Sequence, residues 1–120
     1  MAAAYVERLR DLLAPTITAL PSGVTVDIKH FFSGAAAYAN DRICISLSLV
    51  GLAMKLPEDG RAKLMALGAY PLRYFPKAPI KKHYVILPDG MAGDPDRLGF
   101  WARQSIDHVL TLPAPVRNKK

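Results

Sequence analysis

Residues 31–55 read Phe-Phe-Ser-Gly-Ala-Ala-Ala-Tyr-Ala-Asn-Asp-Arg-Ile-Cys-Ile-Ser-Leu-Ser-Leu-Val-Gly-Leu-Ala-Met-Lys, and this stretch decides the fold. Gly34 opens it, and a turn is expected at Asn40 and Asp41 because both side chains tolerate left-handed geometry. A second turn is expected near Gly51. Between the turns, apolar and polar residues alternate with the period of a half-buried strand. Short strands joined by tight turns predict an antiparallel meander.

The same alternation predicts which side chains share a face of the sheet. In the middle strand, Ile43, Ile45 and Leu47 are expected together on the apolar face. The strand expected before this stretch, over residues 24–29, alternates in the same way. If the alternation continues, His30 and Phe32 lie on its apolar side.

Three helices are expected around this sheet. Residues 2–13 show helical spacing, and Pro15 is expected to end or bend that helix. A second helix should begin at Pro57, followed by two acids that complement the helix dipole. The third should begin at the capping residue Asp94, with a proline in its first turn. The expected apolar face of the second helix consists of Leu64, Met65 and Leu67.

A proline-containing hairpin, with strands over residues 70–75 and 80–87, separates the last two helices. The order helix, three or four strands, helix, two strands, helix predicts an α+β fold of two layers, with helices packed on an antiparallel sheet. A chain of 120 residues fits one domain. We place this domain at residues 1–112 and expect residues 113–120 to form a disordered basic tail.

Charge and composition limit the classes of function. No apolar run approaches the ~20 residues of a membrane span, and the N-terminus lacks the pattern of a signal peptide, so no membrane association is expected. The single cysteine permits no internal disulfide and favours a cytoplasmic location. The net charge of +6 is local, because without the tail and four basic residues near the hairpin the chain is nearly neutral.

No catalytic or metal-binding constellation stands out. His30, His83, His108 and Cys44 show no paired spacing, and there is no phosphate-binding loop. We therefore expect no enzyme activity, no metal and no cofactor. A thiol enzyme that pairs Cys44 with His30 or His83 stays open as an alternative.

The hairpin segment, residues 70–84, carries the only hint of a ligand. It interleaves aromatic and basic residues and contains no acid, a composition that suits base stacking and phosphate contacts. Alternate residues of a hairpin must pack on the core, so a solvated basic edge strand is the favoured interpretation and nucleic-acid binding the alternative. The candidate contacts are Arg73, Lys77, Lys81 and Lys82.

Four segments, taken in order, carry a family resemblance. Residues 31–38 are similar to a Met-Phe-Gly-Gly-x-Gly-x-Tyr opening, and residues 52–55 to a Leu-Tyr-Leu-Lys strand. Residues 67–75 match a Gly-x-x-Pro-Phe region, and residues 84–102 a closing strand and helix. Together they resemble the N-terminal domain family of the TfoX/Sxy competence regulators. The matching positions are Phe32, Gly34, Tyr38, Leu52, Lys55, Gly68, Pro71, Phe75, Tyr84, Pro88, Leu98 and Trp101.

The resemblance implies a two-layer fold similar in layout to the secretion-chaperone fold, and a non-enzymatic role in transcription or competence regulation. Ser33 and Ala36 stand where the family has glycines, so the geometry of that turn can differ here. Full-length members carry a second, helical domain suspected of contacting DNA, which is expected to be missing here. We therefore expect a small regulatory or protein-interaction domain whose partner is another protein or a second copy of itself.

Overall fold

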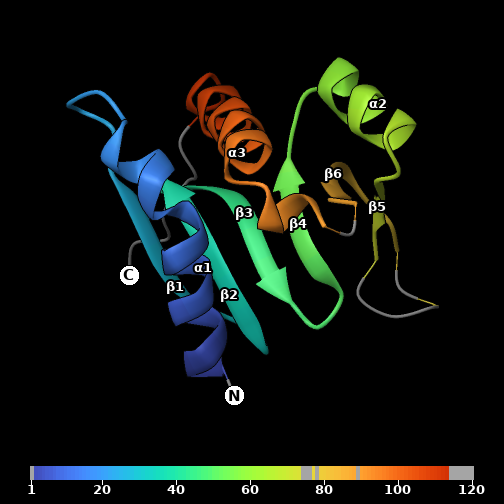
Figure 1. Ribbon diagram of the computed structural model, residues 1–120, viewed down its shortest axis with the longest axis horizontal. Coiled ribbons are helices and arrows are strands. Elements are labelled where there is room, and N and C mark those ends of the chain that lie inside the picture. Colours follow the sequence, from blue (N-terminus) through green and yellow to red (C-terminus); the bar gives the residue numbers. More distant parts are fainter. Residues whose placement is uncertain (1, 74–76, 78, 89, 114–120) are drawn as a thin grey trace.

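One antiparallel sheet organises the molecule (Figure 1). The computed structural model describes residues 2–73, 77, 79–88 and 90–113. The sheet begins with a meander of four strands, as predicted. Two further strands extend it beyond β4, in the order β1-β2-β3-β4-β6-β5. The strands are β1 (Val26–Phe31), β2 (Gly34–Ala39), β3 (Arg42–Ser48), β4 (Gly51–Lys55), β5 (Tyr70–Leu72) and β6 (Lys81–Ile86).

The helices lie together on one side of this sheet (Figure 1). Helix α1 (Ala2–Thr18) packs on β1 and β2, and α3 (Pro95–Leu110) packs on β3 and β4. Helix α2 (Glu58–Ala66) packs against β6, and a short 3₁₀ turn, η1 (Met91–Gly93), precedes α3. This is the predicted two-layer α+β fold. None of the helices in the described part of the chain is both long and apolar enough to cross a membrane.

Helix α3 forms as its sequence predicts. The Asp94 side chain caps it by accepting a hydrogen bond from the Arg97 backbone N–H at 3.3 Å, and Pro95 occupies the first helical position. The helix buries one face in the main core, where it meets α1 and the strands. That face consists of Leu98, Trp101, Ala102, Ser105, Ile106 and Val109.

A β-bulge corrects the predicted face of β3. Ala37 pairs with Ile45 but the next residue, Tyr38, pairs with Ile43, so Cys44 is the extra residue. Cys44 and Ile45 both belong to the main core, whereas Ile43 lies on the opposite side of the sheet beside Tyr38. The prediction that Ile43 shares a face with Ile45 is therefore wrong, because a bulge shifts the alternation by one residue.

The hairpin that joins β1 and β2 contradicts a second expectation. Strand β1 ends at Phe31, so Phe32 lies in the turn and is 86% exposed. His30 pairs with Ala35 and lies on the same face of β1 as Ile28, as predicted, although its side chain is exposed. The next turn follows the prediction: Asn40 and Asp41 both have positive φ, as a type I′ turn requires.

Two helices differ from expectation in extent or in the face they bury. Helix α1 continues past Pro15 to Thr18, and Thr16 in this last turn is buried. The apolar face predicted for α2 is right at Leu64, which is buried, and wrong at Met65 and Leu67, which are exposed.

Arg42 connects the sheet to the chain that follows α3. Its Nε donates to the Leu112 carbonyl oxygen at 2.8 Å, and one terminal nitrogen donates to the Asn40 carbonyl oxygen at 2.8 Å. The guanidinium thus bridges segments that lie 70 residues apart. Some predictions fall outside the described residues: Phe75, the loop at 74–76 and 78, and the tail from 114 onward.

Candidate interaction surface

The side of the sheet that faces away from the helices, here called the open face, is built from alternate strand residues. Lys29, Ala36, Ser46 and Ala53 follow one another across β1 to β4 on this face. Its apolar residues form a second cluster, separate from the main core, to which no described helix residue belongs. The open face is therefore partly apolar although no described helix covers it.

Small, buried residues lie at the middle of the open face. Ala36 is fully buried and Ser46 nearly so, because larger side chains such as Tyr38 stand around them. Three adjoining hollows are present. The central hollow, about 280 Å³, is lined by Phe31, Phe32, Tyr38, Ile43, Ser46, Leu72, Lys81 and Tyr84.

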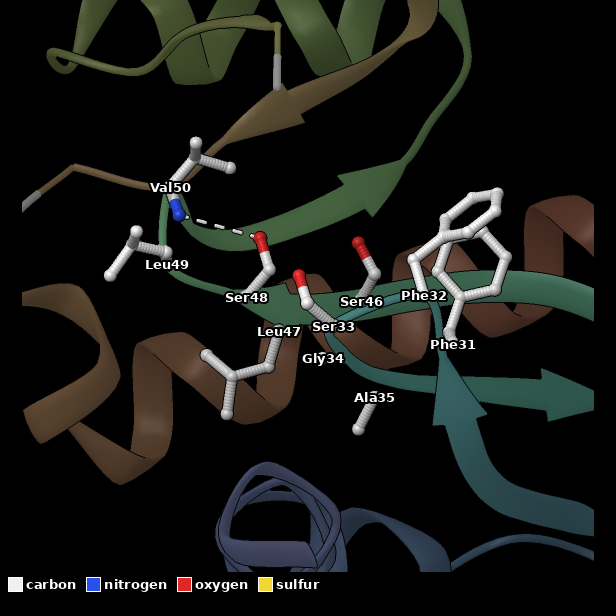
Figure 2. A pocket seen from close by; sticks show the side chains of 10 residues that line it. All are labelled: Phe31, Phe32, Ser33, Gly34, Ala35, Ser46, Leu47, Ser48, Leu49 and Val50. Carbon is white, nitrogen blue, oxygen red and sulfur yellow. Dashed lines mark hydrogen bonds between the residues drawn. The ribbon is translucent and has the colours of Figure 1, made fainter. Parts of the chain in front are cut away.

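The second hollow lies between the β1–β2 and β3–β4 turns and is called the turn hollow (Figure 2). It has a volume of about 380 Å³ and shares Phe31, Phe32 and Ser46 with the central hollow. Figure 2 shows the two phenylalanine rings on one side of it and Leu49 and Val50 on the other, with serine hydroxyls between. The remaining lining residues are Ser33, Gly34, Ala35, Leu47 and Ser48.

The third hollow, called the edge hollow, lies over β5 and β6 and has a volume of about 530 Å³. It shares Val50 with the turn hollow, as the turn hollow shares Phe31, Phe32 and Ser46 with the central one; the three hollows together are here called the band. The lining residues of the edge hollow are Val50, Tyr70, Pro71, Arg73, Ile80 and Ile86.

Exposed apolar side chains concentrate along this band. Of the seven large hydrophobic residues that the described chain exposes, four line the hollows: Phe32, Leu49, Tyr70 and Ile80. Leu49 is 90% exposed. Single exposed apolar residues are ordinary, but a contiguous set around a concavity is typical of a binding surface.

Phe32 combines exposure with backbone strain. Its φ is +53°, a left-handed conformation that bulky residues rarely adopt. Its ring packs on Phe31, with ring centroids 4.6 Å apart. Such strain costs about 1–3 kcal/mol and is found preferentially at functional sites. A phenylalanine that is both strained and exposed has no evident benefit for stability, which favours a role in recognition.

Gly34 permits the close approach of the strands beneath the turn hollow. A Cβ atom at this position would collide with the Leu47 carbonyl oxygen and lie 3.0 Å from the Ser48 Cβ. The close approach of the two strands therefore explains why the opening motif has a glycine at position 34. Ser33 and Ala36, which stand where the family has glycines, are not among the residues with positive φ, so a side chain is compatible with the backbone at both positions.

Cations surround the open face. The Lys29 ammonium lies 5.0 Å from the centre of the Tyr38 ring, and the Lys55 ammonium lies 5.9 Å from that of Tyr84. Lys81 lines the central hollow. No carboxylate of the described residues lines any of the three hollows. Asp27 shares the face but pairs with Tyr38, at the end of β1 remote from Phe31.

Of the four basic residues proposed as nucleic-acid contacts, Arg73 directly follows Leu72, which pairs with Lys81 of β6. Arg73, Lys77, Lys81 and Lys82 are all exposed. Arg73 lines the edge hollow and Lys81 the central hollow, while Lys82 is not among the residues that line either one.

The candidate thiol, Cys44, lies in the main core. It is fully buried, and its Sγ lies 3.4 Å from the Ala37 carbonyl oxygen, to which the thiol donates. Burial raises the pKa of this thiol from 9.0 to about 12, so it is protonated at neutral pH. His30 and His83 are exposed on other strands. Among the described residues, no three His, Cys, Asp or Glu side chains come close enough to hold a metal ion.

The family-signature positions divide between core and open face. Leu52, Leu98 and Trp101 are buried in the main core. Gly68 has a φ of +110° and ends α2, with Pro88 close by. The signature positions on or beside the open face are Phe32, Gly34, Tyr38, Lys55, Pro71 and Tyr84.

Several residues of the open face were not singled out from the sequence. Leu49, Val50 and Ile80 carry no motif, and Ile43 was assigned to the wrong face. One signal was present: Leu49 and Val50 put two aliphatic residues into a turn, where polar residues are the rule.

Fold and surface together define a small α+β domain with one covered and one open sheet face. The chain matches the TfoX N-terminal domain over residues 19–109 and belongs to that family. A search of curated protein sequences gave no match to the chain.

Proposed function

We propose that this chain is a non-enzymatic regulatory domain that binds another protein through the open face. The observation that carries the proposal is the gathering of four exposed large hydrophobic residues around one concave band. Contiguous exposed apolar surface on a folded domain is typical of interaction sites. The strain at Phe32 supports the same assignment, since it costs stability at an exposed apolar residue of this band.

The absence of catalysis is part of this proposal. The one candidate nucleophile, Cys44, is a buried thiol whose raised pKa disfavours the reactive thiolate. The open face itself offers serine and tyrosine hydroxyls and amines, with no histidine or carboxylate among the residues that line the hollows. Hydroxyls and amines can contact a bound protein. Acid–base or nucleophilic catalysis would need a histidine or carboxylate to activate a hydroxyl, and none lines the hollows.

Affinity capture from cell extract at gentle salt, with this chain as bait, tests the proposal. The key variant is Phe32→Asn combined with Leu49→Ser, because asparagine tolerates the left-handed backbone that phenylalanine does not. We expect the double variant to fold with undiminished stability and to lose a protein partner that the wild type retains.

Phe100→Gln is the matched control, because Phe100 is exposed on α3 and lines none of the three hollows. The control should retain the partner. If every protein captured by the wild type is captured equally by the double variant, the open face is not the interaction surface and the proposal fails.

Nucleic-acid binding is the second candidate function. It is favoured by the exposure of Arg73, Lys77, Lys81 and Lys82. It is weakened by the lysines that already lie over the Tyr38 and Tyr84 rings, on which bases would stack. A mobility-shift assay with labelled DNA or RNA at low salt decides it: binding that weakens steeply with salt supports this candidate, and no shift removes it.

A further inference from the structure

We propose that the open face binds an acidic, amphipathic segment of the partner protein, with a bulky apolar side chain in the turn hollow and carboxylates beside Lys29, Lys55 and Lys81. This inference rests on the proposed function and adds the chemistry of the partner.

The turn hollow supplies the apolar contact. Its volume of about 380 Å³ is near the lower end of the range in which proteins enclose small ligands, roughly 300–1,000 Å³. One or two large side chains fill such a space. Phe32 and Leu49 stand on opposite sides of it and lose their exposed apolar surface to an inserted side chain (Figure 2).

The charge of the partner follows from the cations around the band. Lys81 lines the central hollow, next to the turn hollow, and no described carboxylate lines the band to neutralise it. Lys29 and Lys55 hold their ammonium groups over tyrosine rings of the same face, where they remain able to meet an anion. A basic partner would meet like charges at three points, and an acidic one would meet opposite charges.

The same cations disfavour a second copy of this chain as the occupant. Two open faces placed against each other would bring Lys81 of one copy towards lysines of the other, with no facing carboxylates from the band. Nucleic acid offers the right charge but stacks its bases on free aromatic faces. Here the lysines already lie over the rings of Tyr38 and Tyr84, whereas Phe32 and Tyr70 are exposed aromatic residues of the band, so an oligonucleotide is included among the probes.

Fluorescence anisotropy with designed peptides tests the inference directly. The probe is a labelled amphipathic peptide with leucine and phenylalanine at helical spacing and glutamates between them. Its twin has lysine in place of every glutamate, and a labelled single-stranded oligonucleotide is the third probe. We expect the acidic peptide to bind and the basic twin not to bind. Binding should weaken as ionic strength rises from about 0.01 M to about 1 M, where the screening length falls from about 30 Å to about 3 Å.

Two variants locate the binding on the open face. Lys81→Glu should weaken binding of the acidic peptide about fivefold. Lys63→Glu, on the exposed side of α2, makes the same change in net charge and should have little effect on this binding. Phe32→Asn should weaken binding of the acidic peptide about tenfold or more, because it removes an apolar anchor.

Three outcomes would overturn the inference. The first is equal or tighter binding of the basic twin, or no binding of either peptide, which contradicts an acidic partner. The proposed function survives this outcome if the capture experiment still identifies a partner whose binding depends on Phe32. Displacement of the acidic peptide by the oligonucleotide, with both sensitive to Lys81→Glu, assigns the face to nucleic acid instead. A dimer by light scattering that Phe32→Asn converts to a monomer assigns it to a second copy.

Discussion

A side chain at position 34 would meet the backbone of the neighbouring strand. A Cβ atom there collides with the Leu47 carbonyl oxygen, so Gly34→Ala forces β2 and β3 apart next to the turn hollow. Overpacking of this kind costs about 1–3 kcal/mol. We expect the free energy of unfolding of Gly34→Ala to be lower than that of the wild type by about this amount, with a lower midpoint in urea denaturation. Gly93→Ala is the control, since a Cβ at Gly93 meets nothing within 4 Å, and equal midpoints for the two variants would contradict the steric argument.

At the scale of residues, the sequence predicted structural roles better than surface roles. Gly34, the Asn40–Asp41 turn and the Asp94 cap carry local chemistry that depends on a few neighbours, and the structure confirms all three. Phe32 could not be placed, because its exposure depends on where β1 ends, and a one-residue change in strand end moves a side chain between core and solvent.

Helix α3 is fixed to the sheet by a polar contact as well as by its apolar face. The Ser105 hydroxyl is buried and lies 2.9 Å from the Cys44 carbonyl oxygen and 2.8 Å from that of Lys55. These carbonyls lie just beyond the last β3–β4 pair, Ile45 with Met54, where the two strands separate. The hydroxyl thus replaces a partner that the ladder no longer supplies.

Ser105→Ala leaves the Cys44 and Lys55 carbonyls without this donor in a buried site. An unsatisfied buried group costs about 1–3 kcal/mol, so we expect the free energy of unfolding from urea denaturation to fall within that range. Gln104→Ala, on the exposed side of the same helix, controls for helix propensity and should change it little. A Ser105→Ala variant as stable as the wild type would show that water or a small shift satisfies the carbonyls.

At the scale of elements, periodicity gave the type and order of the helices and strands but not their exact faces. The third helix has two start signals, the Asp94 cap and a proline in its first turn, and it begins where they predict. The face of β3 depended on a bulge at Cys44, which no glycine or proline marks in the sequence. The face of α2 was misjudged because Met65 and Leu67 are apolar yet lie away from the sheet.

For the whole molecule, the buried thiol links stability to alkaline pH. The Cys44 thiol has a pKa of about 12 in the folded protein, raised by burial from 9.0. Below pH ~9 the thiol is protonated in both states, and its contribution to stability is complete. Between pH ~9 and ~12 only the unfolded chain ionises, so stability falls by about 1.4 kcal/mol per pH unit.

The comparison of wild type with Cys44→Ala isolates this effect. We expect the free energy of unfolding of the wild type to fall by about 2 kcal/mol more than that of the variant between pH ~8.5 and ~10.5. Tyrosine and lysine titration affects both proteins alike and cancels in the difference. Parallel pH profiles would show that the thiol ionises as easily in the folded protein as in the unfolded one.

The pairing of distant strands and the shape of the open face could not be predicted from the sequence. A meander, a hairpin and three helices could be predicted, and the two-layer fold followed from them. The sequence did not indicate that β6 rather than β5 would pair with β4, nor that hollows would form on the open face. Both depend on contacts between segments far apart in the chain, which local periodicity does not encode.

The Arg42 bridge has a practical use for anyone who immobilises or labels the protein. Because Arg42 binds the Leu112 carbonyl oxygen, residue 112 is held beside the β2–β3 turn. The Phe32 turn lies at the other end of β2, six residues away, or roughly 20 Å along a strand. A dye, biotin or sensor surface joined by a short linker after residue 112 is therefore anchored at the far end of β2 from the turn hollow.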